Sequence, residues 1–145
     1  MTPVMRMLAI IIAALVLQAG PLAAQDRDYR ARERDLTTLS QIFGELHHIR
    51  RTCEPRTEAD AWRNRMRKLI ELEMPQPALQ QTMVEAFNKG YRSAETAYPY
   101  CDRDARDHAA ALAANGDEVA TRLMAPLYDA LAKSGELTHI WGAEN

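Results

Sequence analysis

Cys53 and Cys101 are the chain's two cysteines, and each lies just after the end of a segment with helical periodicity. A disulfide holds its two Cα atoms about 5.5 Å apart. A bond between these cysteines would therefore bring the C-terminal ends of two separate helices together, so that the two helices run parallel. Whether the bond forms depends on the compartment in which the protein works.

The N-terminus has the pattern of a secretory signal peptide. Arg6 supplies a positive charge, residues 7–17 are almost purely apolar, and small residues precede Gln25. This order is typical of a signal peptide, and the apolar run is shorter than the roughly 20 residues that cross a bilayer. We expect a signal peptide over residues 1–24, with cleavage after Ala24 and a periplasmic mature protein. The alternative is an uncleaved membrane anchor.

Two cysteines in a small exported protein usually form a disulfide. Closing the long loop between Cys53 and Cys101 would stabilise the fold by about 4 kcal/mol in the chain-entropy model. The alternative is a pair of free buried thiols, which export disfavours. The spacing of the two residues excludes a CxxC redox motif.

Four segments show helical periodicity, and no strand pattern stands out. The first segment follows a mixed-charge lead-in over residues 25–35 and ends near Thr52. We expect Thr57 to cap the second helix, and Pro75 and Pro77 to end the second and begin the third. The apolar positions of these three helices are Leu36, Leu39, Ile42, Phe43, Leu46 and Ile49, then Trp62, Met66, Leu69 and Ile70, then Leu79, Met83, Phe87, Ala94 and Tyr98.

The third helix carries Gly90 within its apolar face, where a missing side chain lets another helix approach closely. We expect Asp102 to cap the fourth helix, which keeps one helical phase through Gly116 and is kinked at Pro126. Its apolar positions are Ala105, Ala109, Leu112, Val119, Leu123 and Leu127. Residues 135–145 are expected to form a C-terminal tail.

These elements predict an all-α helical domain over residues 36–134. With the cysteines bonded, the helices form a four-helix up-down-up-down bundle stapled by one disulfide. The last helix is long and either kinked or split.

Three motifs at these separations resemble a known family. They are GELHHIRRTC at residues 44–53, WRNRMRKLIE at 62–71 and FNKGYRSAETAYPYC at 87–101. The family consists of small exported proteins of alphaproteobacteria and is catalogued as a domain of unknown function (2385). The resemblance covers residues 36–131. It supports export, the helical fold and the disulfide, and it implies no activity, cofactor or catalytic residue.

A second face of the first helix carries a glycine among polar residues: Gln41, Gly44, Glu45, His48 and Thr52. One interpretation is a solvated polar face. Another is a packing or partner-docking face, where Gly44 permits close approach. Tyr91 and Arg92 of the third helix are expected at the level of Glu45, so a Glu45–Arg92 or His48–Glu95 contact between the helices is possible.

A metal site is the alternative interpretation of the same face. Glu45-x-x-His48 and Glu136-x-x-His139 both have the spacing used by di-iron carboxylate bundles, with Glu71, Glu85 or Glu95 as further ligands. However, Glu45 and His48 point away from the main apolar stripe, and the second motif lies in the expected tail. We assign no cofactor and no catalytic residue, and a metal-binding or enzymatic bundle using Glu45 and His48 remains the alternative.

The charge distribution bears on the partner. The net charge of -2 gives no case for nucleic acid binding. Basic residues gather in the middle of the chain, and Arg63, Arg67 and Lys68 form a basic surface on the second helix, which either faces solvent or meets an anionic partner. We therefore predict a non-catalytic binding or accessory protein of the cell envelope. Its partner is an envelope protein or an anionic envelope surface, and it has no stable membrane span after signal cleavage.

Overall fold

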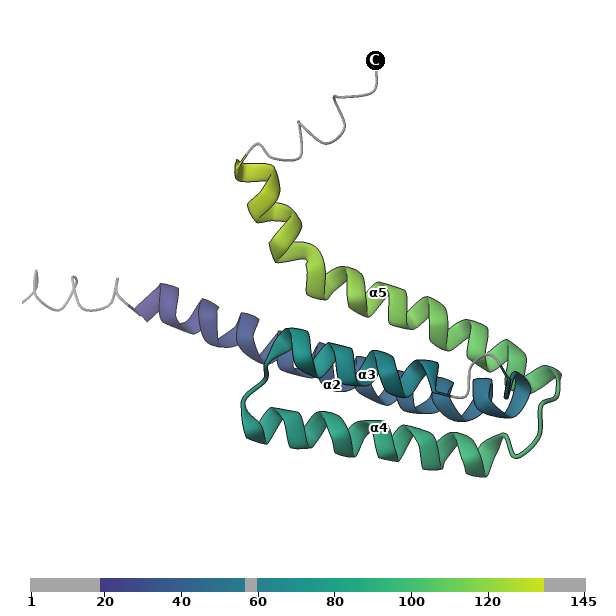
Figure 1. The fold of residues 1–145 in the computed structure, drawn as a ribbon. Coiled ribbons are helices and arrows are strands. Elements are labelled where there is room, and N and C mark those ends of the chain that lie inside the picture. The colour runs from purple at the N-terminus through teal and green to yellow at the C-terminus, as the bar shows by residue number, and fades with distance from the viewer. Residues whose placement is uncertain (1–18, 57–59, 135–145) are drawn as a thin grey trace, which may run out of the picture. The chain divides into compact units, whose positions relative to one another are not determined.

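The computed structural model describes residues 19–56 and 60–134. It contains the helices α2 (Ala19–Cys53), α3 (Ala61–Glu73), α4 (Pro77–Ala97) and α5 (Arg103–Ser134), shown in Figure 1, and no strand in these ranges. Most of the predicted signal peptide, the predicted cap Thr57 and the predicted tail lie outside the described residues. None of the described helices is long and apolar enough to cross a membrane.

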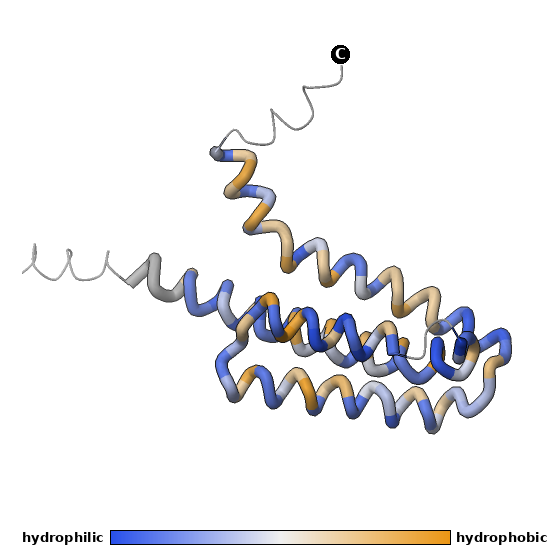
Figure 2. Tube along the Cα trace, in the orientation of Figure 1, coloured by the Kyte–Doolittle hydropathy of each residue, from blue (hydrophilic) through white to orange (hydrophobic). Residues whose placement is uncertain are grey.

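The chain divides into two compact units, one up to Glu33 and one from Arg34 onward. The second unit is the predicted all-α bundle with its disulfide. Figure 2 shows apolar residues recurring along α4 and α5 between hydrophilic ones. This recurrence gives each helix one face for the core. The buried core contains residues from all four helices.

Helix α2 supplies the largest share of the core. All the predicted apolar positions of its stripe are buried except Phe43, which is partly buried. The helix is longer than predicted, because the mixed-charge segment over residues 25–35 is also helical. That segment has no apolar stripe, but it is rich in good helix formers and holds an Arg30–Asp26 pair one turn apart at 3.1 Å.

The connection between α3 and α4 follows the proline signals. Helix α3 ends at Glu73, and Met74 adopts the left-handed conformation with a φ of 42°. Its amide donates to the carbonyl of Ile70 at 3.0 Å and so closes the helix end. Helix α4 then begins at Pro77, whose fixed φ suits the first helical position.

Helices α2 and α4 cross at two glycines. A Cβ atom built on Gly44 would lie 2.0 Å from the carbonyl oxygen of Phe87, and one on Gly90 would lie 2.2 Å from that of Gln41. Each helix therefore places a glycine against the backbone of the other. The prediction that Gly90 permits close approach of another helix is confirmed.

Helix α5 is continuous through Gly116, as its helical phase predicted. Asp102 caps it by accepting the amide of Ala105 at 2.8 Å, which confirms the predicted cap. It runs antiparallel to α2, with Arg122 paired to Asp35 at 2.9 Å. The predicted apolar stripe is buried as far as Leu123, but Leu127 is half exposed. Leu127 follows Pro126, and Figure 1 shows α5 bending away in this region, which separates Leu127 from the core.

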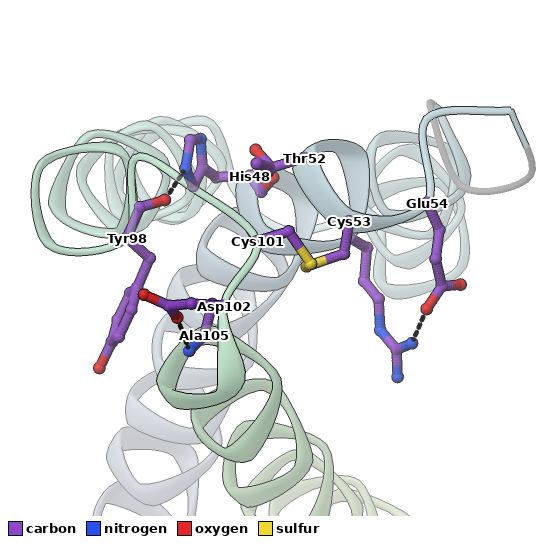
Figure 3. The surroundings of a disulfide bond; sticks show 9 residues. His48, Thr52, Cys53, Glu54, Tyr98, Cys101, Asp102 and Ala105 are labelled. Carbon is purple, nitrogen blue, oxygen red and sulfur yellow. Dashed lines mark hydrogen bonds and ion pairs between the residues drawn. A yellow bond between two sulfur atoms is a disulfide. The ribbon is translucent and has the colours of Figure 1, made fainter.

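The disulfide closes one end of the bundle. Cys53 and Cys101 are bonded with their Cα atoms 5.0 Å apart, as predicted. Figure 3 shows that this end also holds the contact between His48 and the backbone of Tyr98. The C-terminal ends of α2 and α4 therefore meet here, and the helices follow the predicted up-down-up-down order.

Candidate functional site

The predicted polar face of α2 is largely an internal surface. Gly44 and His48 are buried, and His48 is only 7% exposed. His48 Nε2 donates to the carbonyl oxygen of Tyr98 at 2.8 Å, and its ring meets that of Tyr91 edge to face. The interpretation of a solvated face is therefore corrected at these residues, because α4 and the segment after it cover them.

Glu45 has partners that differ from the expected ones. Its Oε1 accepts from Gln41 at 3.0 Å, and its Oε2 accepts from Nε2 of His108 at 3.2 Å. Neither of the two possible contacts, Glu45–Arg92 and His48–Glu95, is formed, and both Arg92 and Glu95 are exposed. The ring of His108 also stacks on Tyr98, with 4.7 Å between ring centroids.

We call Glu45, His48, Tyr98 and His108 the polar clasp. It joins α2, the α4–α5 connection and α5 beside the disulfide. The role of His108 was not predicted, because His108 lies 63 residues from Glu45 and has no motif around it. The helical phase of α5 was the only available signal, since it determines which residues of α5 face α2.

The metal interpretation receives no support from this geometry. Glu45 and His48 bind different partners within the clasp. In the part of the chain that the structure describes, no group of three or more His, Cys, Asp or Glu residues is placed to hold a metal ion. Glu136 and His139 lie outside this part.

His47 is the most unusual polar residue of the bundle. It is 1% exposed and packs against the rings of Phe87 and Tyr91, at centroid distances of 5.7 and 5.6 Å. Neither ring nitrogen has a hydrogen-bond partner among the described residues. Burial lowers the pKa of His47, and the charges of Arg63 and Arg51 lower it further. The ring is therefore held neutral inside the α2–α4 contact.

The predicted basic surface on α3 is exposed. Arg63, Arg67 and Lys68 all face solvent. Lys68 pairs with Glu71 at 3.0 Å, and Arg67 donates to the side chain of Asn64. Arg65, on the same helix, lies over the ring of Trp62 at 4.1 Å. Helix α3 thus presents a basic outer surface next to an aromatic side chain.

An apolar groove lies between α2, α3 and α5 and has a volume of about 280 Å³. Its floor consists of residues that recur every three or four positions on α2: Leu39, Ile42, Phe43 and Leu46. The helical periodicity of α2 predicts these residues for the core, and Leu39, Ile42 and Leu46 are indeed buried, but the periodicity does not predict the opening beside them.

The two walls of the groove differ in character. On α3 the wall consists of Trp62 and Arg65, and Trp62 packs on Phe43 with ring centroids 5.5 Å apart. The buried Nε1 of Trp62 has no hydrogen-bond partner in the described ranges. On α5 the wall consists of small residues and one acid: Ala113, Gly116, Asp117 and Ala120. Small wall residues leave room for a partner's side chains.

No curated protein and no solved structure matches this chain. A family described as a protein of unknown function (DUF2385) matches residues 31–127. This match includes the groove, the polar clasp and both cysteines, and it covers well over half of the chain. The chain therefore belongs to the DUF2385 family of proteins of unknown function.

Proposed function

We propose that the protein is an exported, non-catalytic binding or accessory protein of the cell envelope. The observation that carries the proposal is the apolar groove between α2, α3 and α5, which borders on solvent in a small bundle. Apolar grooves between helices are a common way to bind a peptide segment of another protein. Export is supported by the signal-peptide pattern of residues 1–24 and by the disulfide.

Charge indicates the kind of partner segment. Helix α3 presents Arg63, Arg65, Arg67 and Lys68 to solvent, and of these Arg65 lines the groove. Asp117 lies on the opposite wall. The complementary occupant is an apolar segment of an envelope protein that carries acidic side chains on the edge facing α3.

Two neighbouring alanines of α5 provide a matched test. Ala113 lines the groove, whereas Ala114 is exposed and does not line it. Ala113→Trp should fill the groove and weaken capture of an envelope protein by at least about tenfold, the equivalent of about 1.4 kcal/mol. Ala114→Trp should leave capture unchanged. Equal capture by the two variants would refute the groove as the binding site.

The charge of the partner is tested separately. Arg65→Glu should weaken the same capture, and the cross-linked partner peptide should be apolar with acidic residues. Vesicles containing phosphatidylglycerol test an anionic surface instead. If sedimentation with these vesicles depends on Arg63, Arg67 and Lys68 but is unaffected by Ala113→Trp, the protein binds an anionic surface through α3 and the groove proposal fails.

Export of the protein is tested by a separate experiment. Fractionation of cells should place the protein in the periplasm, and N-terminal sequencing should begin at Gln25. Protein that stays in the cytoplasm would contradict the proposal.

A further inference from the structure

A second cavity lies beside the disulfide. It has a volume of about 150 Å³, and Cys53 is part of its lining, together with Arg50, Glu54 and Arg106. Cys101 does not line it. The cavity therefore borders the Cys53 end of the disulfide and not the Cys101 end.

Access matters because a disulfide is opened by a thiolate that attacks one of its two sulfurs. The other sulfur leaves as a thiolate. In this protein a small thiol that enters the cavity meets the Cys53 side of the bond, so Cys101 would be the leaving group.

The charges around the cavity suit an anionic thiol. Arg50 pairs with Glu54 at 2.7 Å, so these two charges compensate each other. The side chain of Arg106 is exposed and forms no ion pair within the described residues. Its uncompensated positive charge attracts an incoming anion.

We propose that Cys53 is the site at which small anionic thiols open the disulfide. The attacking thiolate forms a bond to Cys53 Sγ, the bond to Cys101 Sγ breaks, and its electron pair leaves on Cys101. A second molecule of the thiol attacks the sulfur of the small molecule in this adduct and releases Cys53 as a thiolate. Two small thiols are oxidised to their disulfide, and the protein disulfide is reduced by two electrons.

Glutathione is the anionic probe. The folded protein is exposed briefly to glutathione, quenched with acid and mapped by peptide mass spectrometry. The early adduct should be at Cys53. Cysteamine, which is cationic, is compared in the same way, because its attack gains nothing from Arg106.

Two arginines of α5 provide matched variants. Arg106→Gln should slow the reaction with glutathione by about threefold, the effect of one charge a few ångströms away through water, and should not slow the reaction with cysteamine. Arg103→Gln should change neither rate, since Arg103 is 91% exposed and pairs with Asp107 at 3.5 Å. An adduct mainly at Cys101, no adduct on the folded protein, or an equal response of the two variants would overturn the proposal.

Discussion

At the scale of single residues, His47 makes the stability of the fold depend on pH. Its ring is buried next to Tyr91 and has no hydrogen-bond partner among the described residues. The positive charges of Arg63 and Arg51 act on it electrostatically. Its folded-state pKa lies below the ordinary value of about 6.5. The unfolded chain therefore takes up a proton more readily than the folded chain as the pH falls.

We predict that the free energy of unfolding is highest above pH 6.5 and declines as the pH falls below it, toward the folded-state pKa of His47. His47→Phe should remove this part of the decline, because phenylalanine does not titrate. Urea unfolding of both proteins between about pH 8 and pH 5 measures the difference. Parallel pH profiles would show that His47 makes no contribution.

A second prediction at the scale of residues concerns Gly44 and Gly116. Gly44→Ala should lower the free energy of unfolding by about 1–3 kcal/mol, because the new methyl group meets the backbone of Phe87. Gly116 is the control, since a Cβ there would lie at an ordinary 3.5 Å from Ile42. Gly116→Ala should raise the same free energy by about 0.5–1 kcal/mol. Thermal or urea unfolding measures both changes in free energy. Similar effects of the two substitutions would contradict the close crossing of α2 and α4.

Only part of the surroundings of these α2 residues could be predicted from the sequence. The helical phase of α2 separated Leu46 and Ile49, which face the core, from Gly44 and His48. It did not show that α4 covers the second face, because that depends on how two distant helices cross. The partner of Glu45 was missed for the same reason, since His108 lies on another helix.

At the scale of elements, the helix boundaries followed local signals where these were strong. The prolines before α4 and the cap at Asp102 are short-range features, and both were predicted. The first part of α2 was missed, because periodicity detects a buried stripe and a polar helix has none. The exposure of Leu127 was missed because a helical phase does not show where the covering helices end.

The prediction at the scale of elements concerns the disulfide. Replacing both Cys53 and Cys101 by serine should lower the free energy of unfolding by about 4 kcal/mol, because the unfolded chain gains the freedom of a loop of 48 residues. Urea unfolding of the wild type and the double variant measures the loss. A loss below about 1 kcal/mol would show that the polar clasp alone holds this end.

At the scale of the whole molecule, the groove lies where α3 and α5 present walls of different size to α2. The wall on α3 carries the large side chains of Trp62 and Arg65, whereas the wall on α5 carries mostly small residues. An opening therefore remains beside Trp62. The groove was not predicted, since the sequence gives the apolar residues but not the gap between the helices beside them.

The most direct test of this account is photo-crosslinking in living cells with a crosslinking residue at one position of α5. With the crosslinker in place of Ala120, which lines the groove, we predict one dominant adduct to an envelope protein, and Arg65→Glu should weaken this adduct. With the crosslinker in place of exposed Ala114, we predict no such adduct. The same adduct from both positions, or an adduct from Ala114 alone, would contradict the claim that the groove is the binding surface.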